Sequence, residues 1–333
     1  MLFSTKIKKL RQFIDEAEDI VFLGGAGVST ESGIPDFRSK NGLYSKPDIN
    51  FAQYEPEYLL SSYCLNENPK VFYEFYRQKF DTRKALPNIT HYKLAELEQW
   101  HNITIITQNV DGLHQKAGSK NVLEIHGSST VCYCRRCGRE YPIDYLFESK
   151  EEIPMCKLCK KEENKYCSKD KAYIRPRISL YGEFLQPAFK QAETRIQKAD
   201  LLIVGGTSLK VHPTADLVAE FLNPAYSVIF GKNKPKRLVI INNQSTDFDS
   251  DADLVFNMPL SKVFKALDTS KEQLMLRDAR ILSLKRFKYS KLNSCGGSFV
   301  YLSQQDKELL NQMTYVSLRM SDDEWKDKLN THF

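Results

Sequence analysis

The chain has 333 residues, of which 41% are hydrophobic and 27% charged, and its formal net charge is +6 at pH 7. This balance is typical of a globular protein, and no apolar run approaches the ~20 residues that a membrane-spanning helix needs. The positive charge, spread over this length, is too weak to indicate a nucleic-acid-binding protein. Composition therefore predicts a globular protein without a membrane-spanning segment.

The first 20 residues predict an amphipathic helix rather than a signal peptide. Ile7, Leu10, Phe13 and Ile14 recur at helical spacing, and charged residues are scattered between them. A signal peptide would need a continuous apolar stretch here. A cytoplasmic location follows as the default expectation.

Five short apolar runs predict the strands of a sheet: Ile20–Leu23, Ile103–Thr107, Val122–Ile125, Leu201–Gly205 and Leu238–Ile241. Several are nearly continuous in apolar residues, as expected of parallel strands that are covered on both faces. Each run is followed by a polar or glycine-containing turn: GGAGVS, QNVDG, HGSS, GGTS or NNQS. Ligands of open α/β sheets bind beyond the carboxyl ends of the strands. We therefore predict a Rossmann-like α/β fold with helices on both faces and one ligand site formed by these turns.

The first turn is the strongest indication of a phosphate-containing ligand. Gly25 and Gly27 follow a strand directly, and glycine there allows close approach to a pyrophosphate. The usual dinucleotide fingerprint requires a third glycine where this chain has Thr30, followed by a helix. The segment SGIPDFRSKNGLYSKPD instead lacks helical periodicity. This pattern argues against a hydride-transferring dehydrogenase.

Six segments in one order carry a resemblance to a known family: GAGVSTESGIPDFR (25–38), TQNVDGLHQKAG (107–118), HG (126–127), IRPRISLYGE (174–183), GTSL (206–209) and the strand ending at Asn242. Together they resemble the sirtuin family over about residues 5–268. The resemblance implies an NAD-dependent protein lysine deacylase, with acetyl as the first expectation for the acyl group and a longer apolar group as an alternative. Such an enzyme transfers the acyl group to ADP-ribose and releases nicotinamide.

The resemblance also implies roles for individual residues. His126 would be the catalytic base, a task suited to an imidazole whose pKa lies near neutral pH. Asn109 and Asp111 would hold the nicotinamide and its ribose, and Asp36, Phe37 and Arg38 would cover them. The remaining implied NAD contacts are Gly25, Ala26, Gly27, Ser29, Gln108, Gly206, Thr207, Ser208 and Asn242. Without the family, Ser208 and Asn242 read equally well as turn-forming residues.

Two cysteine pairs predict a structural zinc site. Cys134 and Cys137 form one Cys-x2-Cys pair, Cys156 and Cys159 form the other, and 18 residues separate the pairs. Four thiolates at this spacing close a tetrahedron around Zn²⁺ and leave no open position for catalysis. Cys132 and Cys167 lie nearby and are competing ligands, and redox-active thiols are the alternative reading.

The cysteine pairs lie in a segment that interrupts the alternation of strands and helices. We predict an inserted zinc-binding module at 128–175, and an NAD-binding part at about 1–127 and 176–268. Together they form a catalytic domain at 1–268. Residues 269–333 lie outside the resemblance and predict an α/β extension, whose role could be oligomerisation, substrate targeting or stabilisation.

The substrate residues are less sharply indicated. Sirtuins that prefer acidic acyl groups have a Tyr-x2-Arg pair where this chain has Tyr76 and Lys79, and lysine loses the bidentate fork of arginine. Alternatively, the aromatic side chains of this helix simply pack in a core. Ser179, Gly182 and Glu183 would contact the acylated peptide, although Ser179 and Leu180 depart from the usual Val-Phe of the family.

Two other functions share parts of this pattern. A mono-ADP-ribosyltransferase or NAD hydrolase would use the same NAD site, but transfer of the sugar alone does not require the base His126. A non-enzymatic NAD sensor or zinc-ribbon nucleic-acid adaptor would need an organised basic and aromatic surface, and RRCGREY is too short to form one.

We therefore expect acylated lysine proteins or peptides as partners. The sequence gives no expectation about the oligomeric state.

Overall fold

The computed structural model describes residues 1–37, 42–43, 51–161, 172–231 and 235–267. A six-stranded sheet forms the centre of the first compact unit, which spans Met1–Lys265. Its strand order is β3-β2-β1-β7-β8-β9, and every neighbouring pair is parallel. The strands are β1 (Ile20–Gly24), β2 (Ile103–Thr107), β3 (Val122–Glu124), β7 (Leu201–Gly205), β8 (Arg237–Asn242) and β9 (Leu254–Asn257).

The five strands predicted from apolar runs are confirmed to within one residue at each end. The sequence did not reveal β9, because its four residues are too short to show a period and it pairs only with β8 at the sheet edge. Strand order reverses between β1 and β7, since β2 and β3 continue to one side of β1 while β8 and β9 continue to the other. Ligands of such sheets bind at this switch point.

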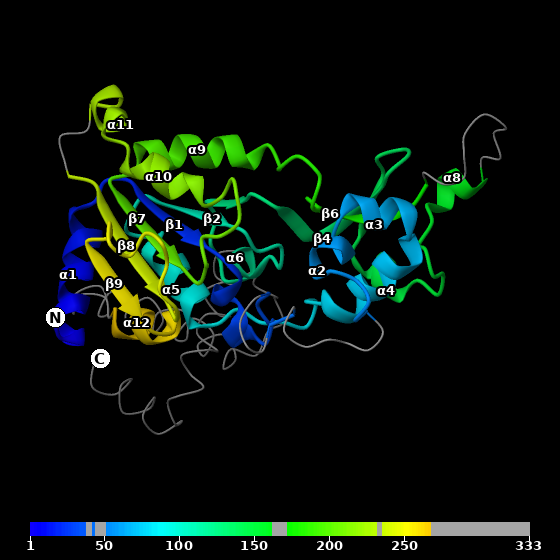
Figure 1. The fold of residues 1–333 in the computed structure, drawn as a ribbon, viewed down its shortest axis with the longest axis horizontal. Helices are drawn as coiled ribbons and strands as arrows, with labels where there is room; N and C mark the ends of the chain where they lie inside the picture. The colour runs from blue at the N-terminus through cyan, green and yellow to red at the C-terminus, as the bar shows by residue number, and fades with distance from the viewer. Residues whose placement is uncertain (38–41, 44–50, 162–171, 232–234, 268–333) are drawn as a thin grey trace, which may run out of the picture. The chain divides into compact units, whose positions relative to one another are not determined.

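Helices cover both faces of the sheet, as predicted (Figure 1). The helices around the sheet are α1 (Phe3–Glu16), α5 (Ile89–Leu97), α6 (Leu113–Lys116), α9 (Ala188–Lys198), α10 (Asp216–Leu222), α11 (Pro224–Ile229) and α12 (Leu260–Ala266). On one face of the sheet, Leu23 and Val204 belong to a core that Ile196 of α9 and Phe221 of α10 complete. On the opposite face, Phe22 packs edge-on against Phe264 of α12.

The predicted amphipathic helix at the start of the chain is α1. Its buried residues are Ile7, Leu10, Phe13 and Ile14, the four that recur at helical spacing in the sequence. Burial of such an apolar stripe, rather than helix propensity, stabilises a helix of this length. Among the described residues, no helix combines the length and apolar character needed to cross a bilayer.

A smaller antiparallel sheet, in the order β5-β4-β6, lies in the part of the chain that carries the cysteines. Its strands are β4 (Gly127–Cys134), β5 (Glu140–Pro142) and β6 (Ile174–Ile178), and its helices are α7 (Asp144–Glu148) and α8 (Lys157–Lys161). Three earlier helices share its hydrophobic cluster: α2 (Pro56–Leu59), α3 (Ser62–Glu67) and α4 (Pro69–Lys79). Phe72, Tyr73 and Tyr76 of α4 are completely buried in that cluster.

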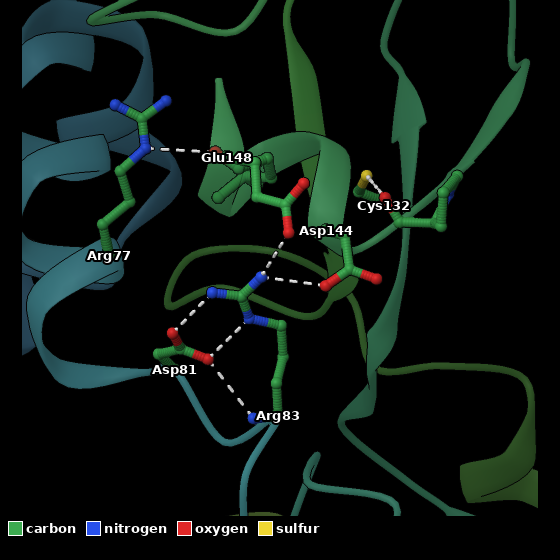
Figure 2. Close-up of polar contacts among 8 residues, drawn as sticks. Arg77, Asp81, Arg83, Cys132, Asp144 and Glu148 are labelled. Atoms are coloured by element: carbon green, nitrogen blue, oxygen red, sulfur yellow. Dashed lines mark hydrogen bonds and ion pairs between the residues drawn. The ribbon is translucent and has the colours of Figure 1, made fainter. Parts of the chain in front are cut away.

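Two arginines fasten α4 and the loop after it to α7 (Figure 2). Arg77 donates hydrogen bonds to the carbonyls of Leu146 and Glu151, at 3.1 and 2.9 Å. Arg83 binds both carboxylate oxygens of Asp81 at 2.8 Å, reaches Asp144 at 2.8 Å, and lies over the Phe147 ring. A planar guanidinium suits such shared recognition. These contacts tie the cysteine-containing segment to a helix far away in the sequence.

Candidate active site

The turns after β1 and β7 meet at the switch point through their backbones. Gly25 donates its amide to Gly205 O at 3.0 Å, and Gly27 donates to Gly206 O at 2.8 Å. A Cβ on Gly27 would lie 2.7 Å from Gly206 Cα, and Gly206 itself has a φ of +60°. Only glycine therefore fits both turns. The amides of Gly25 and Gly27 thus bind the neighbouring turn, and close approach of a phosphate to these two glycines stays a prediction.

A buried polar network connects the first turn with the turn after β2. Ser29 Oγ donates to Asp111 Oδ2 at 2.7 Å and accepts from Asn109 Nδ2 at 3.0 Å. The amide of Leu113 donates to the other Asp111 oxygen at 2.9 Å. Ser29 and Asp111 are buried. Burial raises the pKa of Asp111, and the hydrogen bonds from Leu113 and Ser29 oppose that rise. The network fixes the amide of Asn109 and the carboxyl of Asp111 side by side.

His126 lies directly beyond β3, next to this network. Its Nδ1 is 3.0 Å from Gln108 O, and because a carbonyl only accepts, Nδ1 carries the proton and Nε2 keeps a lone pair. Burial lowers the pKa of His126, partly opposed by the bond to Gln108. The imidazole is therefore oriented, and in its neutral form Nε2 can accept a proton. The carbonyl of His126 also accepts from the Ser179 amide at 2.9 Å, which joins His126 to the predicted substrate segment.

The turn after β7 contributes the other end of the candidate NAD site. Thr207 Oγ1 accepts from Gln108 Nε2 at 3.1 Å and from the Leu209 amide at 3.3 Å. Leu209 has a φ of +52°, a conformation that costs a leucine about 1–2 kcal/mol. Ser208 is thereby placed between a tethered threonine and a strained, buried leucine. Such strain is characteristic of functional turns.

Four further residues were predicted to contact NAD: Asn242, Asp36, Phe37 and Arg38. Asn242 at the end of β8 donates to Gln244 O at 3.0 Å, which is the turn-forming role that the sequence left open. Phe37 packs against Phe80, with ring centroids 6.2 Å apart, and the Asp36 carbonyl accepts from the Leu43 amide at 2.7 Å. Arg38 lies outside the described residues.

The predicted substrate residues divide into two groups. Glu183 forms a bidentate pair with buried Arg175, at 2.5 and 2.9 Å, and Gly182 has a φ of +83° that suits glycine. Burial alone would raise the pKa of Glu183, but the hydrogen bonds from Arg175 and from the Leu180 amide, together with the nearby positive charge, lower that pKa overall. Tyr76, in contrast, is completely buried and stacks on Phe72 and Phe80 in the core.

Lys79, the other member of the predicted acidic-acyl pair, is half-buried in the last turn of α4. Tyr76 and Lys79 share that helix with the aromatic residues of the hydrophobic cluster. Aromatic packing therefore accounts for the Tyr76 ring, whereas the buried Tyr76 hydroxyl has no hydrogen-bond partner among the described residues.

The four cysteines of the two predicted pairs converge on one point. Their sulfur atoms lie within 4.8 Å of one another, with Cys134 to Cys159 at 3.9 Å and Cys137 to Cys156 at 3.8 Å. A tetrahedron of thiolates at the usual Zn–S distance has edges of about 3.8 Å, so the set fits Zn²⁺. Cys132 is not part of this cluster, since its thiol lies 3.3 Å from Pro142 O. Cys167 lies outside the described residues.

The sequence analysis missed Arg175, the residue that binds Glu183, because it has no spacing signal of its own. Gln108 was predicted as an NAD contact, but its hydrogen bonds to His126 through its carbonyl and to Thr207 through its amide are visible only in the structure. Ser29 was predicted as an NAD contact, but its position between Asn109 and Asp111 is visible only in three dimensions.

Replacing Ser29 with alanine is expected to raise the KM for NAD and to lower kcat, so that kcat/KM for NAD falls by roughly tenfold. The substitution leaves the buried Asp111 carboxyl without one of its donors and releases Asn109, a loss of about 1–3 kcal/mol. Steady-state kinetics at varied NAD measures both constants. The matched control is Ser32→Ala, since Ser32 Oγ accepts from Asn88 outside this network. An unchanged KM in Ser29→Ala would contradict the assigned role.

Comparison with known proteins agrees with this geometry. A profile described as the Sir2 family matches residues 25–213. An NAD-dependent protein deacetylase of Clostridium acetobutylicum is 46% identical over 215 residues, which cover 64% of this chain and 82% of the relative. A protein of the same name from Listeria monocytogenes is 44% identical over 209 residues, covering 62% and 82%.

Solved structures agree as well. A Sir2 structure described with a deacetylated p53 peptide and 3'-O-acetyl ADP-ribose superposes with a TM-score of 0.65 and 34% identity, covering 78% of this chain and 96% of the other. A Sir2 structure described with a p53 peptide and NAD+ has a TM-score of 0.61 and 36% identity, covering 78% and 95%. The sequence motifs, the parallel sheet with its switch-point site and these matches agree: the chain belongs to the Sir2 family.

Proposed function

We propose that this chain is an NAD-dependent protein lysine deacylase in which His126 is the catalytic base. The observation that carries the proposal is the imidazole itself, fixed through Nδ1 by Gln108 O beside the Ser29–Asn109–Asp111 network. Relatives named NAD-dependent protein deacetylases support the same reaction. The partners are acylated lysine proteins or peptides, as in the Sir2 structures described with acetylated and propionylated peptides.

Each residue of the site would have its own role in the reaction. NAD, when bound, would supply the nicotinamide–ribose bond, and its sugar carbon would take up the acyl oxygen as nicotinamide leaves. The Asn109 amide would pair with the carboxamide and Asp111 would orient a ribose hydroxyl, and Ser29 holds both side chains. His126 Nε2 would accept a proton from a ribose hydroxyl, because Nδ1 is already bound to a carbonyl. Phe37 would cover the sugar and exclude water.

Acetyl is the acyl group that we propose. An acidic-acyl pocket would need the Tyr76 hydroxyl and a cationic partner to face a shared cavity. Tyr76 is instead completely buried among aromatic rings, and burial raises the pKa of its hydroxyl far above the usual range. The name deacetylase borne by the relatives supports the same preference.

One incubation tests the function. The protein, NAD and an acetyl-lysine peptide are combined, and nicotinamide and deacetylated peptide are quantified together. We expect equal amounts of both, and little nicotinamide when the peptide is omitted. Nicotinamide release without peptide would identify an NAD hydrolase, and label on a protein acceptor would identify an ADP-ribosyltransferase. A succinyl-lysine peptide in parallel tests the acyl group: turnover equal to acetyl would overturn the acetyl preference.

The domain division remains that predicted from the sequence: a catalytic domain at 1–268, its NAD-binding part at about 1–127 and 176–268, and a zinc-binding module at 128–175. The change from a parallel to an antiparallel sheet at β4 supports the module boundary, and the first compact unit ends at Lys265. The α/β extension expected at 269–333 lies outside the described residues. A cytoplasmic location stays part of the proposal, because a cluster of four zinc-binding thiols is typical of a reducing compartment.

A further inference from the structure

A cavity lies next to the predicted substrate segment that follows β6. It has a volume of about 600 Å³ and lies between β4, β6 and the segment that follows β6. Its lining consists of Tyr133, Arg175, Arg177, Ile178, Gly182, Glu183, Phe184 and Gln186. The cavity therefore combines cationic, aromatic and backbone surfaces.

The position of the cavity relates it to the substrate rather than to NAD. Ile178, in its wall, pairs with Gly127, and the next residue, Ser179, donates its amide to His126 O at 2.9 Å. Ser179 Oγ in turn binds Phe184 O at 3.1 Å and Gln186 Nε2 at 3.0 Å, and both of those residues line the cavity. The cavity wall is therefore tied through Ser179 to the backbone of His126.

The two arginines of the lining differ in how easily a ligand can reach them. Arg175 is buried and satisfied, since it binds Glu183 bidentately and the Ile178 carbonyl at 2.7 Å. Arg177 remains 44% exposed, and its ion-pair partner is the exposed Glu140, which does not line the cavity. Exposed pairs of this kind contribute little free energy and exchange readily. Within the lining Glu183 neutralises Arg175, and Arg177 is the surplus positive charge.

Apolar surface accompanies that charge. The Tyr133 ring, which also lines the cavity, lies against the guanidinium of Arg177, with 5.7 Å between the ring centroid and Cζ. Phe184 is 98% exposed, an unusual state for a large aromatic side chain. A ligand with a carboxylate on a short aliphatic chain would contact both the Arg177 guanidinium and the exposed Phe184 ring.

Resting on the proposed deacylase function, we infer that this cavity is a specificity subsite for an acidic residue close to the acyl-lysine of the substrate, read by Arg177. The glutamate or aspartate carboxylate binds the guanidinium, and its stem packs on Phe184. The lining supplies no anion for a basic residue, because Glu183 is occupied by Arg175. The subsite therefore discriminates by charge as well as by contact.

Acetyl-lysine peptides that differ in one residue test the inference. A glutamate, glutamine or lysine is placed in turn at each position near the acetyl-lysine on both sides, and kcat/KM is measured at low and high salt. We expect one position at which glutamate exceeds glutamine by about fivefold, with a smaller ratio at high salt. Lysine at that position should be the poorest of the three.

Enzyme variants assign the effect to Arg177. In Arg177→Gln the ratio of glutamate to glutamine peptide should fall to about one, and Arg177→Lys should restore part of it. The matched control is Arg195→Gln, an exposed arginine of α9 outside the cavity, which should keep the full ratio. A wild-type ratio of one at every position, or a full ratio in Arg177→Gln, would overturn the subsite. Absence of turnover on every peptide would instead refute the proposed function.

Discussion

Replacing His126 with alanine is expected to lower kcat for deacetylation by about 10²–10⁴-fold, the usual contribution of a positioned general base. The structure gives the reason: Nδ1 is committed to Gln108 O, so the whole proton-accepting capacity lies on Nε2. His126→Asn preserves a donor toward that carbonyl but supplies no base, and it should be as inactive as the alanine variant. Steady-state assay of peptide deacetylation at saturating NAD measures both.

The pH dependence of the wild-type enzyme gives a second readout of the same group. Burial lowers the pKa of His126 below its ordinary value of 6.5, and the neutral imidazole is the active form. Activity should therefore persist as the pH falls through 6.5 and decline only below it. His101→Ala is the control, since His101 precedes the amino end of β2, opposite the site. Full activity in His126→Ala with an unchanged profile would refute the mechanism.

Removing one zinc ligand is expected to have the largest effect on stability. Structural zinc contributes about 10–16 kcal/mol of apparent binding free energy in small zinc-finger peptides, and the cluster around Cys134 and Cys156 has no fifth thiol among the described residues to replace a lost one. Cys156→Ala should abolish zinc binding and unfold the antiparallel sheet. Zinc content by atomic absorption, thermal unfolding and limited proteolysis between β4 and β6 measure the loss.

Cys132→Ala is the matched control for that experiment. Cys132 is equally buried and lies two residues from a ligand, but its thiol contacts the carbonyls of Tyr141 and Pro142 instead. This variant should keep one zinc ion per chain and lose only packing free energy. Loss of zinc in Cys132→Ala, or retention of zinc with an unchanged Tm in Cys156→Ala, would show that the ligand set is wrong. Chelation of the wild type should reproduce the Cys156→Ala result.

The two metal-binding turns depend on contacts that reach well beyond the cysteines. Tyr141 lies 3.1 Å from Cys156 Sγ through its hydroxyl, and Tyr73 of α4 donates its hydroxyl to Ile174 O at 2.9 Å. Arg77 and Arg83 add the contacts to α7 shown in Figure 2. Helix α4 thus supports the zinc-binding sheet, and loss of zinc should loosen the packing of α4 as well.

The sequence by itself determined the local elements and the cysteines that cluster. Apolar runs predicted five parallel strands, spacing predicted α1 with its buried face, and the Cys-x2-Cys pairs predicted the four thiols that converge. These features are local or periodic, because a strand covered on both faces and a metal-binding turn are written in consecutive residues.

The tertiary structure alone decided how distant residues act together. Strand order placed the turns of Gly25 and Gly206 in backbone contact, and it brought Ser29 between Asn109 and Asp111. The same packing buried Tyr76 in a core that the helix pattern could equally have left facing a ligand. Such contacts depend on which faces meet, and a hydrophobic period specifies a face without specifying its partner.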